Sequence, residues 1–179
     1  AYVINIGRPV DDGVKIKIVN GQIAFRDADV NGNIPIGTMA EFYKMADALN
    51  GKYLQEADID FMNISMRSLV YTEYGATLRN FTGTYDGGNH RISNIKVVAN
   101  GVNFPGLFGR NAGTIKNLTI DSVTVTSSGK GTTGGFRGHN EAGGIIEFCV
   151  NDGVKVSGDG GSYGGIVGRN WGTVRFCGN

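Results

Sequence analysis

Apolar and polar residues alternate in short stretches over residues 81–179. Leu118 and Ile120 form one such stretch, and Val123 and Val125 form the next. Alternation with a period of two places every second side chain on the same face of a β-strand. The three- and four-residue spacing that marks an amphipathic helix is missing from this part of the chain. It is therefore predicted to consist of short strands separated by glycine-rich turns.

The same part of the chain contains an internal repeat. Three matching six-residue blocks begin at Gly106, Gly135 and Gly165, so their spacing is 29 and then 30 residues. A second matched block follows each of them, at residues 113–118, 144–149 and 172–177. Short strands that recur every 20–50 residues are typical of solenoids and propellers, and a propeller blade needs about 40 residues. The repeat therefore predicts a parallel β-helix with one coil for each repeat.

Equivalent residues of successive coils should stack along the solenoid axis, about 4.8 Å apart. The repeat predicts two inward-facing apolar columns, Ile92–Ile115–Ile146–Val174 and Ile95–Leu118–Cys149–Cys177. Asn111, Asn140 and Asn170 are predicted to form an amide ladder. The stacked cysteines are within plausible reach of a disulfide bond, while an apolar column equally suits two buried thiols.

The motifs resemble a known family. The run Phe81-Thr82-Gly83-Thr84-Tyr85-Asp86-Gly87-Gly88-Asn89-His90-Arg91-Ile92-Ser93-Asn94-Ile95, followed by Gly106-Leu107-Phe108-Gly109, resembles the GLUG repeat of bacterial surface proteins. The resemblance covers about residues 34–179 and departs from the motif at Phe136-Arg137, where two apolar residues are expected. It implies an all-β, right-handed parallel β-helix in an adhesin-like, extracellular bacterial protein, sometimes as a non-catalytic module of a large peptidase.

The N-terminal third has a different pattern. Residues 38–51 are predicted to form an amphipathic helix, since Thr38 and Glu41 make a capping box and Phe42 begins an apolar stripe. Such a helix would cap the open end of the solenoid. Asn20-Gly21 predicts a hairpin turn upstream. The expected division is a hairpin and lead-in segment (1–37), a capping helix (38–51) and the solenoid (52–179).

Composition narrows the class of protein. Hydrophobic residues make up 40% of the 179 residues, so the chain can build a core, and the 30 glycines fit many turns. A net charge of +1 gives no reason to expect a nucleic-acid partner. No apolar run approaches the roughly 20 residues that cross a bilayer, so membrane insertion is not expected either.

Residues 27–34 match the first eight positions of a calcium-binding loop. Oxygen-bearing side chains stand at Asp27, Asp29, Asn31 and Asn33, with Gly32 at the sharp turn. The bidentate acid that such a loop carries at its twelfth position is missing, because Thr38 stands there. Calcium is the only cofactor that the sequence suggests, and a simple polar turn is the alternative.

Asp121 and Asp152 occupy equivalent positions one repeat apart. Stacked carboxyl groups about 5 Å apart match the separation of the two acids in a retaining glycosidase. A polysaccharide lyase or glycoside hydrolase is therefore one alternative function. The other reading is that each aspartate binds the backbone of its own turn, and no Arg or Lys is expected beside the pair.

Arg110, His139 and Arg169 form a predicted column of cations beside the glycine bends. The column suggests a stripe that binds an acidic glycan or a phosphate, and solvated charges on exposed turns are the simpler interpretation.

These features favour a non-enzymatic binding or scaffold module at the cell surface, with an extracellular glycan or a host protein as its partner. A purely structural stalk is a further alternative. The sequence stops within a repeat, so we expect the last coil to be continued by further repeats or covered by a partner.

Overall fold

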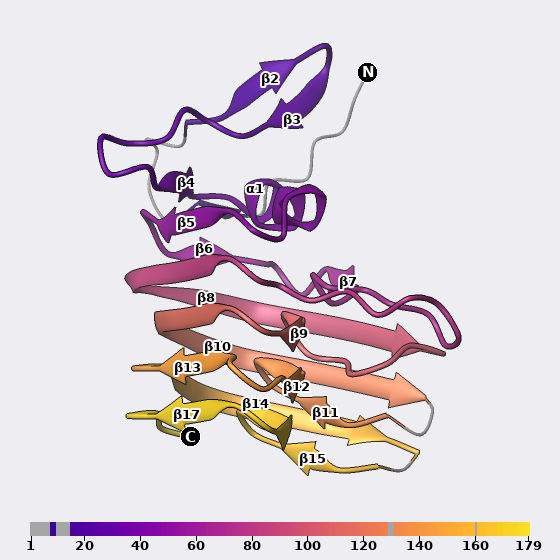
Figure 1. Ribbon diagram of the computed structural model, residues 1–179. Helices are drawn as coiled ribbons and strands as arrows, with labels where there is room; N and C mark the ends of the chain where they lie inside the picture. The colour runs from indigo at the N-terminus through magenta and orange to yellow at the C-terminus, as the bar shows by residue number, and fades with distance from the viewer. Residues whose placement is uncertain (1–7, 10–14, 129–130, 160) are drawn as a thin grey trace.

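A computed structural model describes residues 8–9, 15–128, 131–159 and 161–179 (Figure 1). Its parallel strands form a β-solenoid of about four turns with one short α-helix near the N-terminus, which confirms the predicted fold class. The elements in chain order are β1 (Arg8–Pro9), β2 (Lys17–Val19), β3 (Gln22–Ala24), β4 (Ile34–Ile36), α1 (Met39–Lys44), a 3-10 turn (Met45–Asp47), β5 (Lys52–Gln55), β6 (Ile59–Asp60), β7 (Ser65–Met66), β8 (Thr84–Asn100), β9 (Gly109–Asn111), β10 (Thr114–Ser128), β11 (Thr133–Gly134), β12 (Arg137–Asn140), β13 (Ile145–Glu147), β14 (Val150–Gly158), β15 (Tyr163–Gly164), β16 (Val167–Asn170) and β17 (Thr173–Arg175).

The walls of the solenoid are parallel sheets. The largest contains β8 and β10, with β13 and β14 paired in turn to β10, and β17 paired to β13. A second wall consists of β9, β12 and β16, and β11 pairs with β15 in a third. Each strand therefore binds its equivalent in the next coil, as a repeat near 30 residues requires.

The strands of the largest wall are longer than the sequence predicts. β8 spans 17 residues and β10 spans 15, because the chain bends without leaving the sheet. Left-handed residues make these bends: Asn94, Ser122 and Gly153 stack at one of them, with φ of 56°, 53° and 79°. Asparagine and glycine tolerate this conformation, so short polar residues as well as glycine-rich turns mark the corners.

The predicted columns are confirmed in part. Ile115, Ile146 and Val174 lie in register on successive coils. The prediction is wrong for the first coil, since Ile92 pairs with Ile120 and Ile95 with Val123, and Tyr85 stands above Ile115. The spacing of 23 residues between Ile92 and Ile115 matched two similar blocks that stand at different positions within their coils.

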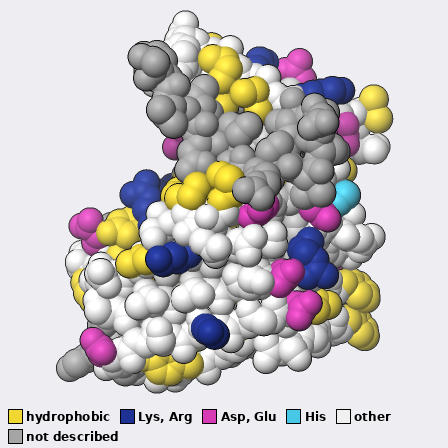
Figure 2. Space-filling view, turned by 180° about the vertical axis from the view of Figure 1, so that it is seen from behind, with side chains coloured by type: hydrophobic (Ala, Val, Ile, Leu, Met, Phe, Trp, Pro, Cys, Tyr) yellow, Lys and Arg dark blue, Asp and Glu magenta, His cyan; other side chains and the backbone are white. Residues whose placement is uncertain are grey.

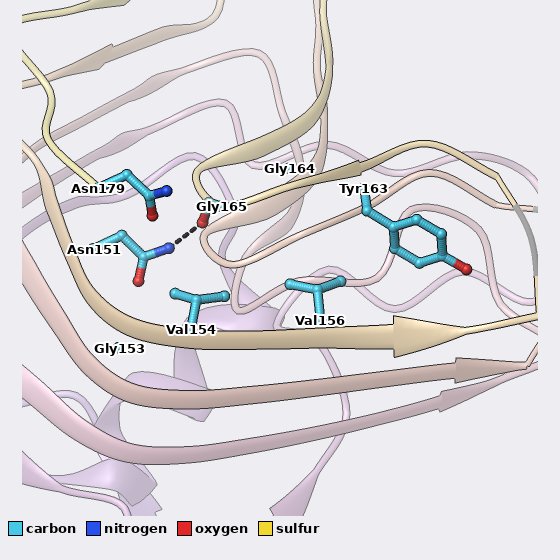
Figure 3. A pocket seen from close by; sticks show the side chains of 8 residues that line it. All are labelled: Asn151, Gly153, Val154, Val156, Tyr163, Gly164, Gly165 and Asn179. Carbon is cyan, nitrogen blue, oxygen red and sulfur yellow. Dashed lines mark hydrogen bonds between the residues drawn. The ribbon is translucent and has the colours of Figure 1, made fainter.

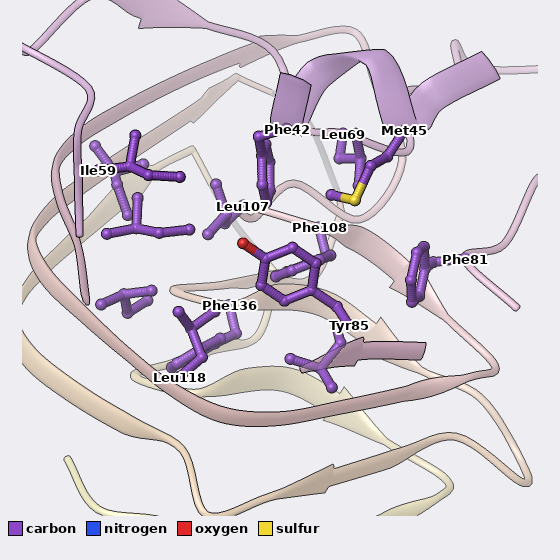
Figure 4. Close-up of a cluster of buried hydrophobic side chains, with 14 of the residues drawn as sticks. Phe42, Met45, Ile59, Leu69, Phe81, Tyr85, Leu107, Phe108, Leu118 and Phe136 are labelled. Atoms are coloured by element: carbon purple, nitrogen blue, oxygen red, sulfur yellow. The ribbon is translucent and has the colours of Figure 1, made fainter. Parts of the chain in front are cut away.

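Aromatic side chains fill the N-terminal half of the interior (Figure 4). Phe42, from α1, makes edge-to-face contacts with Phe61, Tyr85 and Phe108 at centroid distances of 5.4–5.7 Å. Edge-to-face pairs of this kind add to the stabilisation from burial alone. Toward the C-terminus aliphatic residues such as Leu118 and Ile146 replace the aromatic rings.

The helix covers the N-terminal end of the solenoid (Figure 1). Thr38 caps it by accepting a hydrogen bond from the Glu41 N–H at 3.1 Å, as predicted. The α-helix itself is shorter than the predicted 38–51. It ends at Lys44, where the 3-10 turn follows, and beyond this turn the Leu49 carbonyl accepts N–H groups from Thr82 and Gly83.

The predicted hairpin is present as β2 and β3, which pair antiparallel around Asn20 and Gly21. Both turn residues have positive φ, 52° and 74°, as a two-residue hairpin turn requires. β4 follows the hairpin and pairs in parallel with β5, so the solenoid sheet takes in residues that precede the helix.

Candidate functional site

The predicted column of cations is in register. Arg110 of β9, His139 of β12 and Arg169 of β16 pair with one another on three successive coils. Their surroundings differ from the exposed turns that the sequence suggests, because His139 is buried and Arg110 is half-buried. Only Arg169, on the last of the three coils, is exposed.

One acid lies beside two of the three residues and compensates the charge of Arg110. Glu141 follows β12 and accepts a hydrogen bond from the Arg110 guanidinium. Its Oε1 atom also lies 3.1 Å from Nδ1 of His139, although neither ring nitrogen of His139 is aligned for a hydrogen bond. Within the described residues Arg169 forms no ion pair, so it is the uncompensated charge of the column.

Aromatic rings separate the members of the column. The Arg110 guanidinium lies 5.3 Å from the centroid of Phe104, and the His139 ring lies 4.9 Å from the same centroid. Trp171 makes an edge contact with His139 at 4.6 Å, and the Arg169 guanidinium lies 4.8 Å from the Trp171 ring. These contacts reduce the repulsion expected between stacked cations, since each aromatic face attracts positive charge.

These surroundings favour the neutral form of the His139 ring. Burial lowers its pKa, which the nearby Glu141 partly offsets and the two arginines reinforce. The charge that the column presents to solvent therefore comes from Arg169, on the ring of Trp171, which is 59% exposed.

The two candidate acids, Asp121 and Asp152, also lie in register, on β10 and β14. The expectation that no cation stands beside them is wrong. Nη1 of Arg91 donates to Oδ2 of Asp121 at 2.9 Å and to Oδ2 of Asp152 at 3.5 Å. Arg91 is on β8, and its long side chain reaches diagonally across the strand pairs.

This arginine supplies a structural reason for the acid pair, because one guanidinium bridges three coils. The Ser122 hydroxyl also donates to Asp121 at 2.9 Å. A hollow of about 380 Å³ lies beside the acids and is lined by Asn63, Ser122, Val123, Thr124, Gly153, Val154 and Lys155. On the face shown in Figure 2, acidic and basic side chains are mixed, and neither sign forms a large patch.

The calcium-like loop closes on itself. The Asp29 carboxylate accepts N–H groups from Asn31 at 2.8 Å and Asn33 at 2.9 Å, and the bond from Asn33 lowers the pKa of Asp29. The Asn33 carbonyl, a ligand in such loops, accepts the Asp29 N–H, while Asp27 pairs with Lys17. Within the described residues no three His, Cys, Asp or Glu side chains form a metal-binding group. Calcium binding stays a prediction from the sequence pattern.

The C-terminal coil leaves part of the interior open. A hollow of about 390 Å³ lies between β14 and the turn that joins β15 to β16 (Figure 3). Val154 and Val156 form its apolar floor, and the Asn151 side-chain amide donates to the Gly165 carbonyl at its edge. Both valines are only half-buried, because no further coil lies over them among the described residues.

Several residues of these sites escaped the sequence analysis. Trp171, Glu141 and Arg91 were not predicted to take part in any site. Glu141 and Trp171 stand directly after the matched asparagines Asn140 and Asn170, so their shared place in the repeat was a signal that could have identified them. Arg91 gave none, because its contacts depend on the corrected register of the first coil.

Comparison with known proteins identifies one similar surface protein and no family. No protein-family model matches the chain, and no solved structure matches it. The chain is similar to Halomucin of Haloquadratum walsbyi, with 34% identity over 96 residues, which cover 44% of this chain and 1% of that protein. The chain thus spans a very small part of its relative. The β-solenoid and this similarity are consistent with a surface or structural module.

Proposed function

We propose that the chain is a non-enzymatic surface module, a solenoid scaffold that binds an acidic extracellular glycan through Arg169. The observation that carries this proposal is the uncompensated charge of Arg169 at the exposed end of a column whose other members are paired with Glu141. A partner with a carboxylate or sulfate group would supply the missing charge.

The surroundings of Arg169 support recognition of an anion. Arginine presents a planar array of donors that matches the two oxygens of a carboxylate. The Trp171 ring, 4.8 Å from the guanidinium, restricts the arginine side chain before a ligand arrives. Preorganisation of this kind reduces the entropy lost on binding.

The solenoid supports a scaffold role as well. Its coils are held together by backbone hydrogen bonds and by the amide ladder, in which Asn111 donates to Asn140 at 3.1 Å and Asn140 donates to Asn170 at 2.8 Å. A stiff wall of this type places surface side chains at a constant spacing. A ligand with repeating charges can then contact more than one coil.

Binding of polygalacturonate, a polymer of uronic acids, tests the proposal. The wild-type chain should bind it, with an affinity that falls as salt is added. Arg169→Gln and Trp171→Ala should each weaken binding about tenfold or more. The matched control is Arg175→Gln, on the same coil, whose guanidinium already pairs with Glu147 at 2.6 Å.

Three results would contradict the proposal. One is equal binding by the Arg169 variant and the wild type, and another is equal binding of neutral dextran. The third is cleavage of the polymer with loss of activity in Asp121→Asn, which would favour the polysaccharide-degrading alternative.

A further inference from the structure

Cys149 and Cys177 lie directly above one another on the last two coils. Val150 pairs in parallel with Gly178, and the Gly178 N–H donates to the Cys149 carbonyl at 3.0 Å. The Asn151 N–H donates to the Gly178 carbonyl at 2.9 Å, so the register is held on both sides. Neighbouring parallel strands lie about 4.8 Å apart, within the Cα–Cα range of about 4.4–6.8 Å found in disulfides.

The two side chains point into the same interior column. Cys149 is fully buried in the core, and Cys177 is partly buried against it. Both thiols are free, and each lies beside a backbone carbonyl that accepts a hydrogen bond from it, Glu147 for Cys149 at 3.3 Å and Arg175 for Cys177 at 3.2 Å.

The two thiols differ in reactivity. The neighbouring Cys149 thiol lowers the pKa of Cys177, against the effect of its burial, and Cys177 together with burial raises the pKa of Cys149. Arg137 favours the Cys177 thiolate further. Its guanidinium is fully buried, and Nε and Nη2 have no hydrogen-bond partner within the described residues.

We propose that Cys149 and Cys177 are a disulfide-forming pair that locks the last coil to the one before it, with Cys177 reacting first. The Cys177 thiolate attacks a small-molecule disulfide such as oxidised glutathione, forms a mixed disulfide and releases one glutathione thiolate. Cys149 then gives up its proton, its sulfur attacks the Cys177 sulfur, and the second glutathione leaves as a thiol. The protein loses two hydrogens in total, and one molecule of oxidised glutathione is reduced to two thiols.

The bridge would act where two coils share few backbone hydrogen bonds. Among the described residues, the coil that carries Cys177 pairs with the preceding coil on this wall through the three residues of β17 and β13 and the single bridge of Val150 to Gly178, so it should open readily. A covalent link there opposes that opening. This inference does not depend on a ligand, so its test is independent of the test of the proposed function.

Mass spectrometry of the full chain tests the proposal. Reduced folded protein is incubated with oxidised glutathione near neutral pH, and remaining thiols are then alkylated. The expected product is one chain lighter by two hydrogen atoms, with no alkylation and with a peptide that joins Cys149 to Cys177. The bridged form should unfold roughly 5–10 °C higher than the reduced form.

Two variants separate the steps. Cys149→Ala should accumulate a stable glutathione adduct at Cys177, and Cys177→Ala should leave Cys149 unmodified under the same conditions. The proposal is overturned if the wild-type protein keeps both thiols, holds a lasting glutathione adduct, or links two chains instead of one. The wild-type result alone shows whether the disulfide forms, so the test remains valid even if a variant fails to fold.

Discussion

At the scale of single residues, the interior of the solenoid contains one side chain that departs from its repeat. Arg137 stands where the matched blocks have Phe108 and Val167, and it is fully buried. Its Nη1 donates to Oδ1 of Asn140 at 2.5 Å, which leaves the other donors unpaired. Burial lowers the pKa of Arg137 to about 9, so the buried charge costs free energy at neutral pH.

Replacing this arginine by a flexible apolar residue should stabilise the fold. We expect Arg137→Met to raise the free energy of unfolding by about 1–3 kcal/mol at pH 7, as measured by chemical denaturation. Asn140 keeps a donor in the variant, because Asn111 also donates to its Oδ1. Lys155→Met on the exposed wall is the matched control and should change stability by less than about 0.5 kcal/mol.

The contribution of Arg137 to the free energy of unfolding changes with pH in a definite direction. Above pH 9 the native state releases the Arg137 proton, while the unfolded chain, in which the pKa of this arginine keeps its higher ordinary value, retains it. The unfolded state then binds more protons, so wild-type stability gains from rising pH. The advantage of Arg137→Met should therefore narrow from about pH 8 to about pH 10. A lower free energy of unfolding in Arg137→Met than in the wild type would contradict this prediction, because it would show that the buried guanidinium stabilises the fold.

At the scale of elements, an ion pair joins the helix to the segment that follows the hairpin. Nε and Nη2 of Arg26 donate to the Glu41 carboxylate at 2.7 and 3.1 Å, and the Gly37 N–H donates to it at 3.0 Å. Glu41 is 1% exposed. The capping box of the sequence analysis gave Glu41 a local role, and the structure adds a tertiary one.

Loss of this carboxylate should be costly. We expect Glu41→Gln to lower the free energy of unfolding by about 2–4 kcal/mol, because the guanidinium of Arg26 keeps its charge and loses the more buried of its two carboxylate partners, Glu41 and Glu56. Asp47→Asn is the control, since its pair with Lys44 is exposed, and should cost less than about 1 kcal/mol. Similar losses in the two variants would mean that the buried pair has no special role.

The elements also show what the sequence could predict. Repeat spacing and alternation identified the solenoid, its glycine corners and the Asn111–Asn140–Asn170 ladder, because each depends on residues at the same position of successive repeats. The register of the first coil could not be predicted, because the bulge between Lys116 and Leu118 shifts it. The Arg91 bridge and the contact of Trp171 with His139 were missed for a related reason, since each joins residues at different positions of the repeat.

At the scale of the whole molecule, the fold is a stack of coils. The register between neighbouring coils decides which side chains lie above one another. The core columns, the cation column, the Arg91 bridge and the cysteine pair all depend on that register. A different offset between coils would separate every one of these groups. The part of the chain that the structure describes contains no helix with the length and apolar character of a membrane span.

The most direct measurement of that register is paired cysteine cross-linking between β8 and β10. In a chain with Cys149→Ala and Cys177→Ala, the pair Lys96→Cys with Thr124→Cys should form a disulfide on mild oxidation, because these residues lie opposite each other. The pair Lys96→Cys with Thr119→Cys, which the 23-residue spacing would bring together, should stay reduced. Cross-linking of the second pair in place of the first would contradict the stacking on which the account depends.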